Sequence, residues 1–176
     1  MAVRLPVTTL VGHVSRAISF YELPNIYFAL GRTSPWEGEN EPDFSAPLPS
    51  VEAKELDELI GMKKVETKSL VVPDDEGTII YRDSTWRKIS ADDAIALGAH
   101  WVYIEASIFY EELYAAAYRQ IGVFSRVKPK EGVPQSKTLL LPEEIQSVGI
   151  LEVFDQRKVV NRNEDSKDTF SMIIEF

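Results

Sequence analysis

The sequence contains no cysteine among its 176 residues. Disulfide bonds and thiolate metal sites are therefore excluded, and the fold does not depend on an oxidising compartment. No apolar run approaches the ~18 residues that a membrane-spanning helix needs. Residues 1–20 hold one early arginine and a broken apolar run, which is not typical of a signal peptide. We expect a soluble protein that is made in a cytoplasm.

Histidine is also scarce, since His13 and His100 are the only two and no H-x-x-x-H pattern is present. Zinc sites and histidine-based catalysis are therefore disfavoured. The sequence has neither a G-x-S-x-G turn nor a G-K-[ST] phosphate loop. Asp74–Gly77 (DDEG) lacks the alternating acids of a calcium loop and predicts a turn. We predict no catalytic residue, no metal site and no cofactor.

Positive charge is in deficit, with 19 basic against 28 acidic residues and a net charge of −9. The excess is local, because residues 36–59 carry eight acids and a single base, Lys54. A chain without a basic stripe is a poor binder of nucleic acid and is repelled by anionic membranes. We therefore expect neither as a partner. The 44% of apolar residues is sufficient for a buried core.

Eight short apolar or alternating runs, separated by turn residues, predict about seven strands. The last two runs are expected to pair as a hairpin across the polar loop 161–167. The runs are 25–31, 65–73, 77–83, 85–90, 100–110, 115–127, 149–160 and 168–176.

Helix signals are fewer. Residues 8–20 have helical spacing but also fit an extended arm, and both alternatives stay open. Residues 51–60 predict a helix with Ser50 as its N-cap and a stop at Gly61. A short helix ending at Gly98 and a single turn in residues 141–146 (LPEEIQ) complete the set. The predicted fold class is α+β, mainly β: an antiparallel sheet or sandwich with two or three short helices, in one domain over residues 1–176 with an N-terminal arm over residues 1–20.

Four prolines fall between residues 33 and 50 and predict a long, protruding, Pro-rich acidic loop. Gly31 is expected to provide unusual backbone angles where this loop leaves its strand. Trp36 either pins the loop to its own domain or anchors an interface, and Arg32 is expected to stack on it. Our interface candidates are Arg32, Pro35, Trp36, Glu37, Glu39, Glu41 and Phe44.

The stretch NIYFALGRTSPWEGENEP resembles a motif of baseplate wedge proteins of contractile-tailed bacteriophages. Its matched residues are Asn25, Tyr27, Gly31, Arg32, Pro35, Trp36, Asn40 and Pro42. Residues 62–65 (MKKV) follow in register. The run GTIIYRD is similar to the family's G-T-x-Y-x-x-Y-D, with Arg82 where a tyrosine is more typical. In the second half, YRQIGVF is the part most similar to tail-associated proteins.

The resemblance implies a structural protein of the virion, located in the baseplate of a contractile tail and assembled in the host cytoplasm. Its partners would be other baseplate or tail subunits, with a homo-oligomer as a further option. It implies no enzymatic activity.

Two alternatives remain open. In the first, the chain is an adaptor at the head–tail junction or elsewhere in the tail. In the second, it is a small enzyme or ligand-binding domain with a carboxylate-lined pocket. In the second case the candidate acid is Glu105, which shares a strand face with Trp101 and Tyr103.

Overall fold

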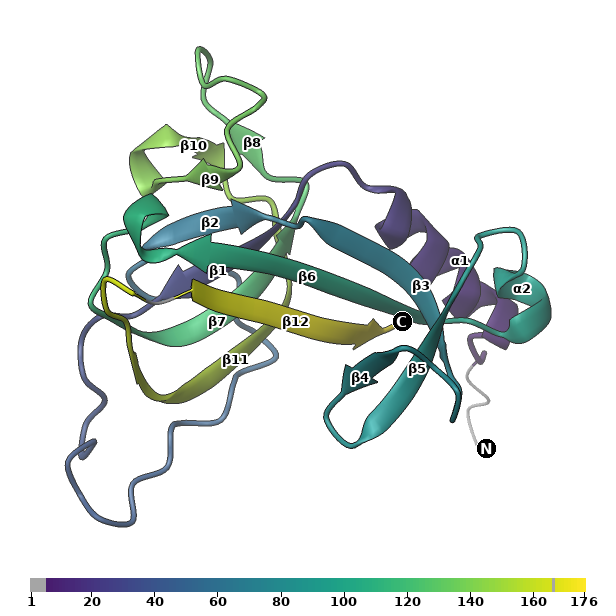
Figure 1. The fold of residues 1–176 in the computed structure, drawn as a ribbon, viewed down its shortest axis with the longest axis horizontal. Helices are drawn as coiled ribbons and strands as arrows, with labels where there is room; N and C mark the ends of the chain where they lie inside the picture. Colours follow the sequence, from purple (N-terminus) through teal and green to yellow (C-terminus); the bar gives the residue numbers. More distant parts are fainter. Residues whose placement is uncertain (1–5, 166) are drawn as a thin grey trace, which may run out of the picture. The chain divides into compact units, whose positions relative to one another are not determined.

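The computed structural model describes residues 6–165 and 167–176. These residues are mainly β, with antiparallel sheets and two α-helices, as the sequence predicts (Figure 1). The chain divides into two compact units. Unit 1 holds residues up to 23, 67–105 and 171–176, and unit 2 holds residues 24–66 and 106–170. The single domain predicted for residues 1–176 stays a prediction.

Unit 2 is built on a five-stranded sheet with β1 in the middle. The strands lie in the order β11 (Ile150–Asn161), β7 (Ala117–Ser125), β1 (Ile26–Gly31), β2 (Gly61–Lys64) and β9 (Leu139–Leu140). A separate pair joins β8 (Lys128–Pro129) to β10 (Ile145–Ser147). Single 3-10 turns occupy Tyr110–Glu112 and Pro142–Glu144, and the second of them confirms the turn predicted there.

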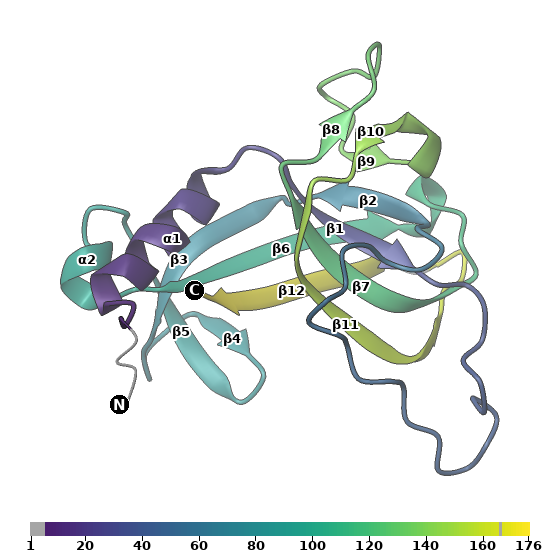
Figure 2. The ribbon, with the colours of Figure 1, turned by 180° about the vertical axis from the view of Figure 1, so that it is seen from behind.

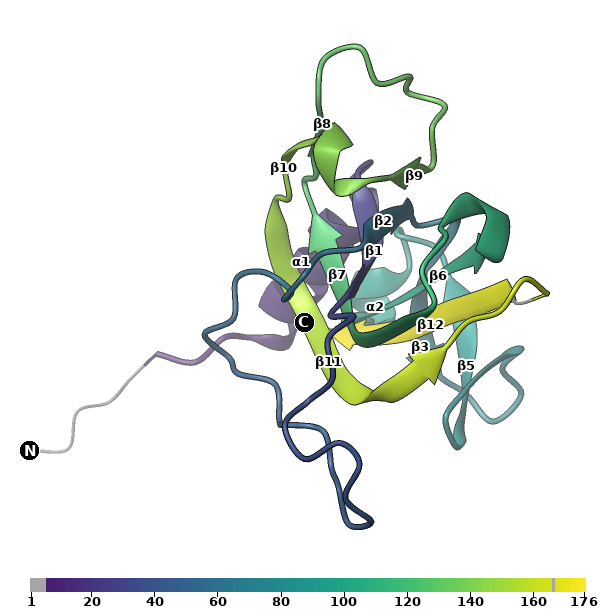
Figure 3. The same cartoon turned by 90° about the vertical axis from the view of Figure 1, so that its left-hand side faces the viewer.

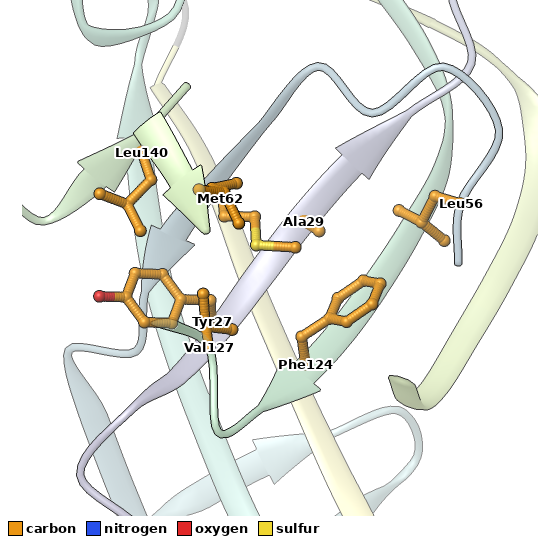
Figure 4. Packing of buried hydrophobic residues seen from close by; sticks show 8 residues of the cluster. Tyr27, Ala29, Leu56, Met62, Phe124, Val127 and Leu140 are labelled. Atoms are coloured by element: carbon orange, nitrogen blue, oxygen red, sulfur yellow. The ribbon is translucent and has the colours of Figure 1, made fainter. Parts of the chain in front are cut away.

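Strand β1 is buried along its whole length because side chains cover both of its faces. On one face, Tyr27 and Ala29 belong to a core cluster (Figure 4). The other members are Leu56, Met62, Phe124, Val127, Leu140 and Ile145. On the opposite face, the ring of Phe28 lies 5.9 Å from that of Phe170. Burial on both faces accounts for the unbroken apolar run in this strand.

Unit 1 contains both helices and strands of the second sheet. The second five-stranded sheet has the order β12 (Lys167–Glu175), β6 (Trp101–Phe109), β3 (Thr67–Pro73), β5 (Ser84–Ile89) and β4 (Ile79–Tyr81). Strands β6 and β12 have residues in both units. One core cluster of unit 1 consists of Val71, Ile79 and Tyr103, against which Trp86, Trp101 and Ile173 pack.

The helices of unit 1 follow their capping signals. Helix α1 (Leu10–Glu22) begins after Thr9, whose side chain accepts a hydrogen bond from the first turn. Its buried positions are Val14, Ala17 and Phe20. Of the two alternatives for residues 8–20, the structure has the helix, and residues 1–5 lie outside the described residues. Helix α2 (Ala94–Leu97) ends at Gly98, whose φ is 65°, as the sequence predicts.

The helix predicted for residues 51–60 is wrong, because these residues form turns and irregular backbone. Leu56 belongs to the core cluster beside β1, and Leu59 packs against that cluster, from irregular backbone. The Asp57 carbonyl accepts a hydrogen bond from Arg32 N, and Ile60 N donates to the Leu30 carbonyl. These bonds to β1 and its exit take the backbone groups that a helix would have used.

The predicted C-terminal hairpin is also wrong. Both strands form, but β11 pairs with β7 and β12 neighbours β6, so the two lie at the edges of different sheets. Arg162, in the connection between them, is buried. Its guanidinium pairs with Asp168 and donates to the backbone carbonyls of Leu113 and Phe109. Side-chain bonds thus hold this turn in place of a strand ladder.

Candidate protein–protein interface

Residues 32–60, which we call the β1–β2 segment, contain no helix or strand. The segment leaves the end of β1, extends below β11 and returns past it to β2 (Figures 2 and 3). It contains all seven residues that the sequence nominates for an interface. Side chains of β7 and β11 hold parts of it in place, as the following contacts show.

Gly31 allows the segment to lie close against β1. A Cβ atom there would lie 2.8 Å from Cβ of Leu56 and 2.9 Å from the carbonyl oxygen of Asp57, which is closer than Cβ atoms approach other heavy atoms in folded proteins. The predicted reason for this glycine, unusual backbone angles, is wrong. The left-handed conformation belongs to the next residue, Arg32, whose φ is 58°.

Arg32 and Trp36 form the stacked pair that the sequence predicts. The guanidinium carbon of Arg32 lies 3.8 Å from the indole centroid. The same guanidinium donates to the Pro35 carbonyl and to a carboxylate oxygen of Asp57, both at 3.2 Å. Trp36 is 8% exposed, and its Nε1 donates to the carbonyl of Arg157 at 3.0 Å. The indole therefore fixes the start of the segment to β11.

Arg119 of β7 locks the next turn of the segment. Its guanidinium is buried, and Nε and Nη2 each donate to the Glu39 carboxylate at 2.6 Å. Its Nη1 donates to the carbonyl of Thr33. The hydrogen bond from Arg119 is the main cause that lowers the pKa of Glu39. A bidentate, charge-assisted hydrogen bond of this kind is among the most directional contacts that proteins form.

Glu58, near the C-terminal end of the segment, binds residues at its N-terminal end. Its carboxylate accepts hydrogen bonds from Thr33 N at 3.0 Å, Thr33 Oγ1 at 2.6 Å and Ser34 N at 3.0 Å. The hydrogen bonds from Ser34 and Thr33 lower the pKa of Glu58 to about 2, so it is ionised at neutral pH. The two ends of the segment are thus tied to each other.

Two glutamines continue this network into the sheet. The side-chain oxygen of Gln120 accepts a bond from Asp57 N at 2.8 Å, and its amide donates to Gln156 at 3.2 Å. Gln156 in turn donates to the Leu48 carbonyl at 3.2 Å. Arg119 and both glutamines are not among the residues that the sequence nominates. The available signal was the polar pair Arg119–Gln120 within the otherwise apolar strand YRQIGVF.

The seven nominated residues therefore fall into two groups. Arg32, Trp36 and Glu39 contact their own unit through the bonds above. Pro35, Glu37 and Glu41 are exposed and Phe44 is half-buried. Within the described part of the chain, several exposed acids of the segment have no ion-pair partner: Glu37, Glu41, Asp43, Glu52 and Glu55. The interface role of all seven nominated residues stays a prediction.

The alternative acid, Glu105, is engaged by its neighbour. The Tyr103 hydroxyl donates to a Glu105 carboxylate oxygen at 2.5 Å, and burial followed by this bond raises the pKa of Tyr103 to about 12. A cavity of about 640 Å³ in unit 1 does contain carboxylates. One of them, Asp74, pairs with Arg87 at 2.6 Å, and that bond lowers its pKa, the opposite of what a general acid needs.

In residues 6–165 and 167–176, no cluster of three or more His, Asp or Glu side chains is placed to hold a metal ion. None of the helices in those ranges combines the length and apolar character for crossing a membrane.

Two comparisons bear on what such a surface is for. A family model described as "baseplate wedge 3 tail fiber network component" matches residues 5–176. A curated relative, "Virion protein 3" of Enterococcus phage phiEF24C, is 32% identical over 161 residues, and the alignment covers 86% of each chain. The family match extends over both units and over the whole β1–β2 segment.

Proposed function

Because the chain belongs to the family of baseplate wedge 3 tail fiber network components, we propose that it is a building block of a contractile phage tail. It is a structural virion protein that acts through contacts with other proteins and catalyses no reaction. The observation that carries this proposal is the family match over residues 5–176, supported by a virion protein at 32% identity.

The proposed place of the chain is the baseplate wedge, and its neighbours are other baseplate or tail subunits. The family description names a wedge and a tail fiber network, so subunits of these two kinds are the first candidates. The net charge of −9 supports protein partners over nucleic acid or anionic membranes. Assembly takes place in the host cytoplasm, and self-association of the chain is a further option.

The exposed side of the β1–β2 segment is the proposed contact. Glu37, Glu41 and Asp43 present negative charge there, while Pro35 and Phe44 add apolar surface. Arg32, Trp36 and Glu39 contribute indirectly, because their internal bonds fix the shape that the exposed side chains present. Pre-organisation of this kind lowers the entropy cost of binding.

The location of the chain in the particle tests the function. Electron-microscopic density of intact virions is expected to contain this fold in the wedge region of the baseplate. Density at the head–tail junction would favour the adaptor alternative and overturn the wedge assignment. Absence of the chain from purified virions, or turnover of a small molecule by the purified protein, would overturn the structural role.

A charge-reversal pair tests the contact. Phage carrying Glu37→Lys with Glu41→Lys is expected to incorporate less of this chain into particles, measured by quantitative mass spectrometry of purified virions. Glu131→Lys with Glu164→Lys is the matched control, since it reverses the same charge at two exposed sites outside the segment. Equal incorporation of both variants would remove the segment from the interface.

A further inference from the structure

A narrow groove runs between the later part of the β1–β2 segment and strand β11. Pro49, Ser50, Val51 and Ala53 form one wall, and residues 151–154 form the other, enclosing about 230 Å³. This volume is below the roughly 300–1,000 Å³ of ordinary small-molecule sites. The groove suits a protein side chain better than a cofactor or metabolite.

Contacts with the rest of unit 2 hold both walls of the groove in place. Leu151 and Phe154 pack against the core cluster beside β1, so the strand side is anchored in the core. On the segment side, the Leu48 carbonyl is bonded to Gln156. Pro47 and Pro49 flank that point and stiffen the backbone. The groove is therefore part of the folded unit and does not depend on a free loop.

Apolar side chains are exposed beside the groove. Val51, which lines the groove, is fully exposed, and Leu48 and Ile150, each next in the sequence to a lining residue, are 90% and 50% exposed. Three exposed aliphatic side chains beside one groove leave apolar surface in water that a partner would cover. Small apolar clusters of this kind, closed off by a polar rim, are typical of the energetic centres of protein interfaces.

Acidic residues lie in the lining of the groove or next to it in the sequence: Glu152 lines it, Glu52 lies between two lining residues, and Glu55 follows Ala53 by two positions. Glu52 and Glu55 are exposed and, among the described residues, have no ion-pair partner, while Glu152 accepts a hydrogen bond from Ser125. Lys54 is the one basic residue of the segment after Arg32. A second copy docked through the same face would bring acids against acids, which disfavours a symmetric contact.

On the basis of the proposed function, we infer that the groove binds a basic segment of a different tail subunit. An aliphatic side chain of that segment enters between residues 49–53 and 151–154. Lysine or arginine side chains on either side of it pair with Glu52 and Glu55. The apolar anchor supplies most of the affinity, and the flanking charges select the partner and its orientation.

Site-specific photo-crosslinking in the assembled virion tests this directly. A photoreactive amino acid replaces Val51, whose exposure makes misfolding a small risk. The expected product is a covalent link to a different tail subunit, and peptide mapping places it in a segment with net positive charge and an aliphatic residue. The matched control carries the same group at Ile80 of unit 1, which is 77% exposed, and is expected to give another product or none.

Three results would overturn the inference: a link to a second copy of this chain, a link to an acidic segment, or no link at Val51 in particles that contain the chain. Each of these leaves the structural role intact. Loss of that role shows itself differently, as absence of the chain from virions. The two failures are therefore distinguishable.

Two double variants measure separately how much the acidic residues and the apolar side chains contribute to the affinity for a basic segment. The probe is a synthetic peptide with one leucine flanked by lysines, titrated into the full chain at low salt. Binding is expected to weaken roughly tenfold with Glu52→Lys plus Glu55→Lys, and by a similar factor with Leu48→Ser plus Val51→Ser. The controls are Glu131→Lys plus Glu164→Lys, and Ile80→Ser. Equal binding of a peptide with serine in place of the leucine would contradict the anchor.

Discussion

The two halves of the β1–β2 segment use their side chains in opposite ways. In residues 32–39, Glu39 is paired with Arg119 of β7, and the Trp36 indole is bonded to β11 of the same unit. In residues 48–55, two aliphatic side chains and two acids remain exposed. The segment thus contains one part that is fixed by contacts within its own unit and another part whose side chains remain exposed to solvent. Mutations of the internally bonded Trp36 or Glu39 should change stability, and mutations of side chains that stay exposed, Glu37 among them, should change assembly.

The largest effect on stability is expected at Trp36. Trp36→Ala removes a buried indole, its stack with Arg32 and its bond to Arg157, and should lower the free energy of unfolding by about 3–5 kcal/mol. Chemical denaturation measures this. Trp36→Phe is the control: it keeps an aromatic ring but loses the Nε1 bond, at a cost of about 1 kcal/mol. A stable alanine variant would mean that the first half is not fixed by its indole.

A smaller loss is expected from crowding at Gly31. Gly31→Ala places a methyl group 2.8 Å from Leu56 and should lower the free energy of unfolding by about 1–3 kcal/mol. Gly12→Ala in α1 is the matched control, because its nearest neighbour is a threonine side chain and alanine favours the helix. Denaturation midpoints compare the two. Equal midpoints would show that the segment does not need its close approach to β1.

The pH dependence of stability should reveal Glu58. Its folded pKa of about 2 lies below its ordinary value, so its stabilisation is present above an unfolded pKa of about 4.3 and is lost as pH falls toward 2. The difference in unfolding free energy between the wild type and Glu58→Gln should therefore shrink over this range. Glu55→Gln is the exposed control. A difference that stays constant from pH 7 to pH 2 would contradict the three hydrogen bonds.

Local patterns predicted the longer strands, such as β1, β3, β6 and β7, because burial and turn residues determine them. The short strands β2, β8, β9 and β10 correspond to none of the predicted runs. The wrong predictions concern long-range competition. Residues 51–60 have a helical pattern, but their backbone groups bond to β1 and its exit. The C-terminal strands β11 and β12 have a hairpin pattern, but β11 pairs with β7.

The candidate interface was predictable in part. The stack of Arg32 on Trp36 follows from their spacing, and the resemblance to baseplate wedge proteins is confirmed by the family match. Spacing did not reveal that Glu39 is held by Arg119, because 80 residues separate the two. The acids of the segment look alike in the sequence. Only their partners in space separate those that hold the fold from those that are exposed.

The smallest stability effect and the sharpest test of the comparison are both expected in the second half. Leu48→Ser with Val51→Ser changes two exposed side chains, so each substitution should alter the unfolding free energy by about 0.5 kcal/mol or less. The same double variant should reduce the amount of this chain in purified virions, measured against wild-type particles. If it instead destabilises the isolated chain as much as Trp36→Ala does, the second half is packed like the first. Assembly would then have no reserved surface there, because a partner can only cover side chains that the folded chain leaves exposed.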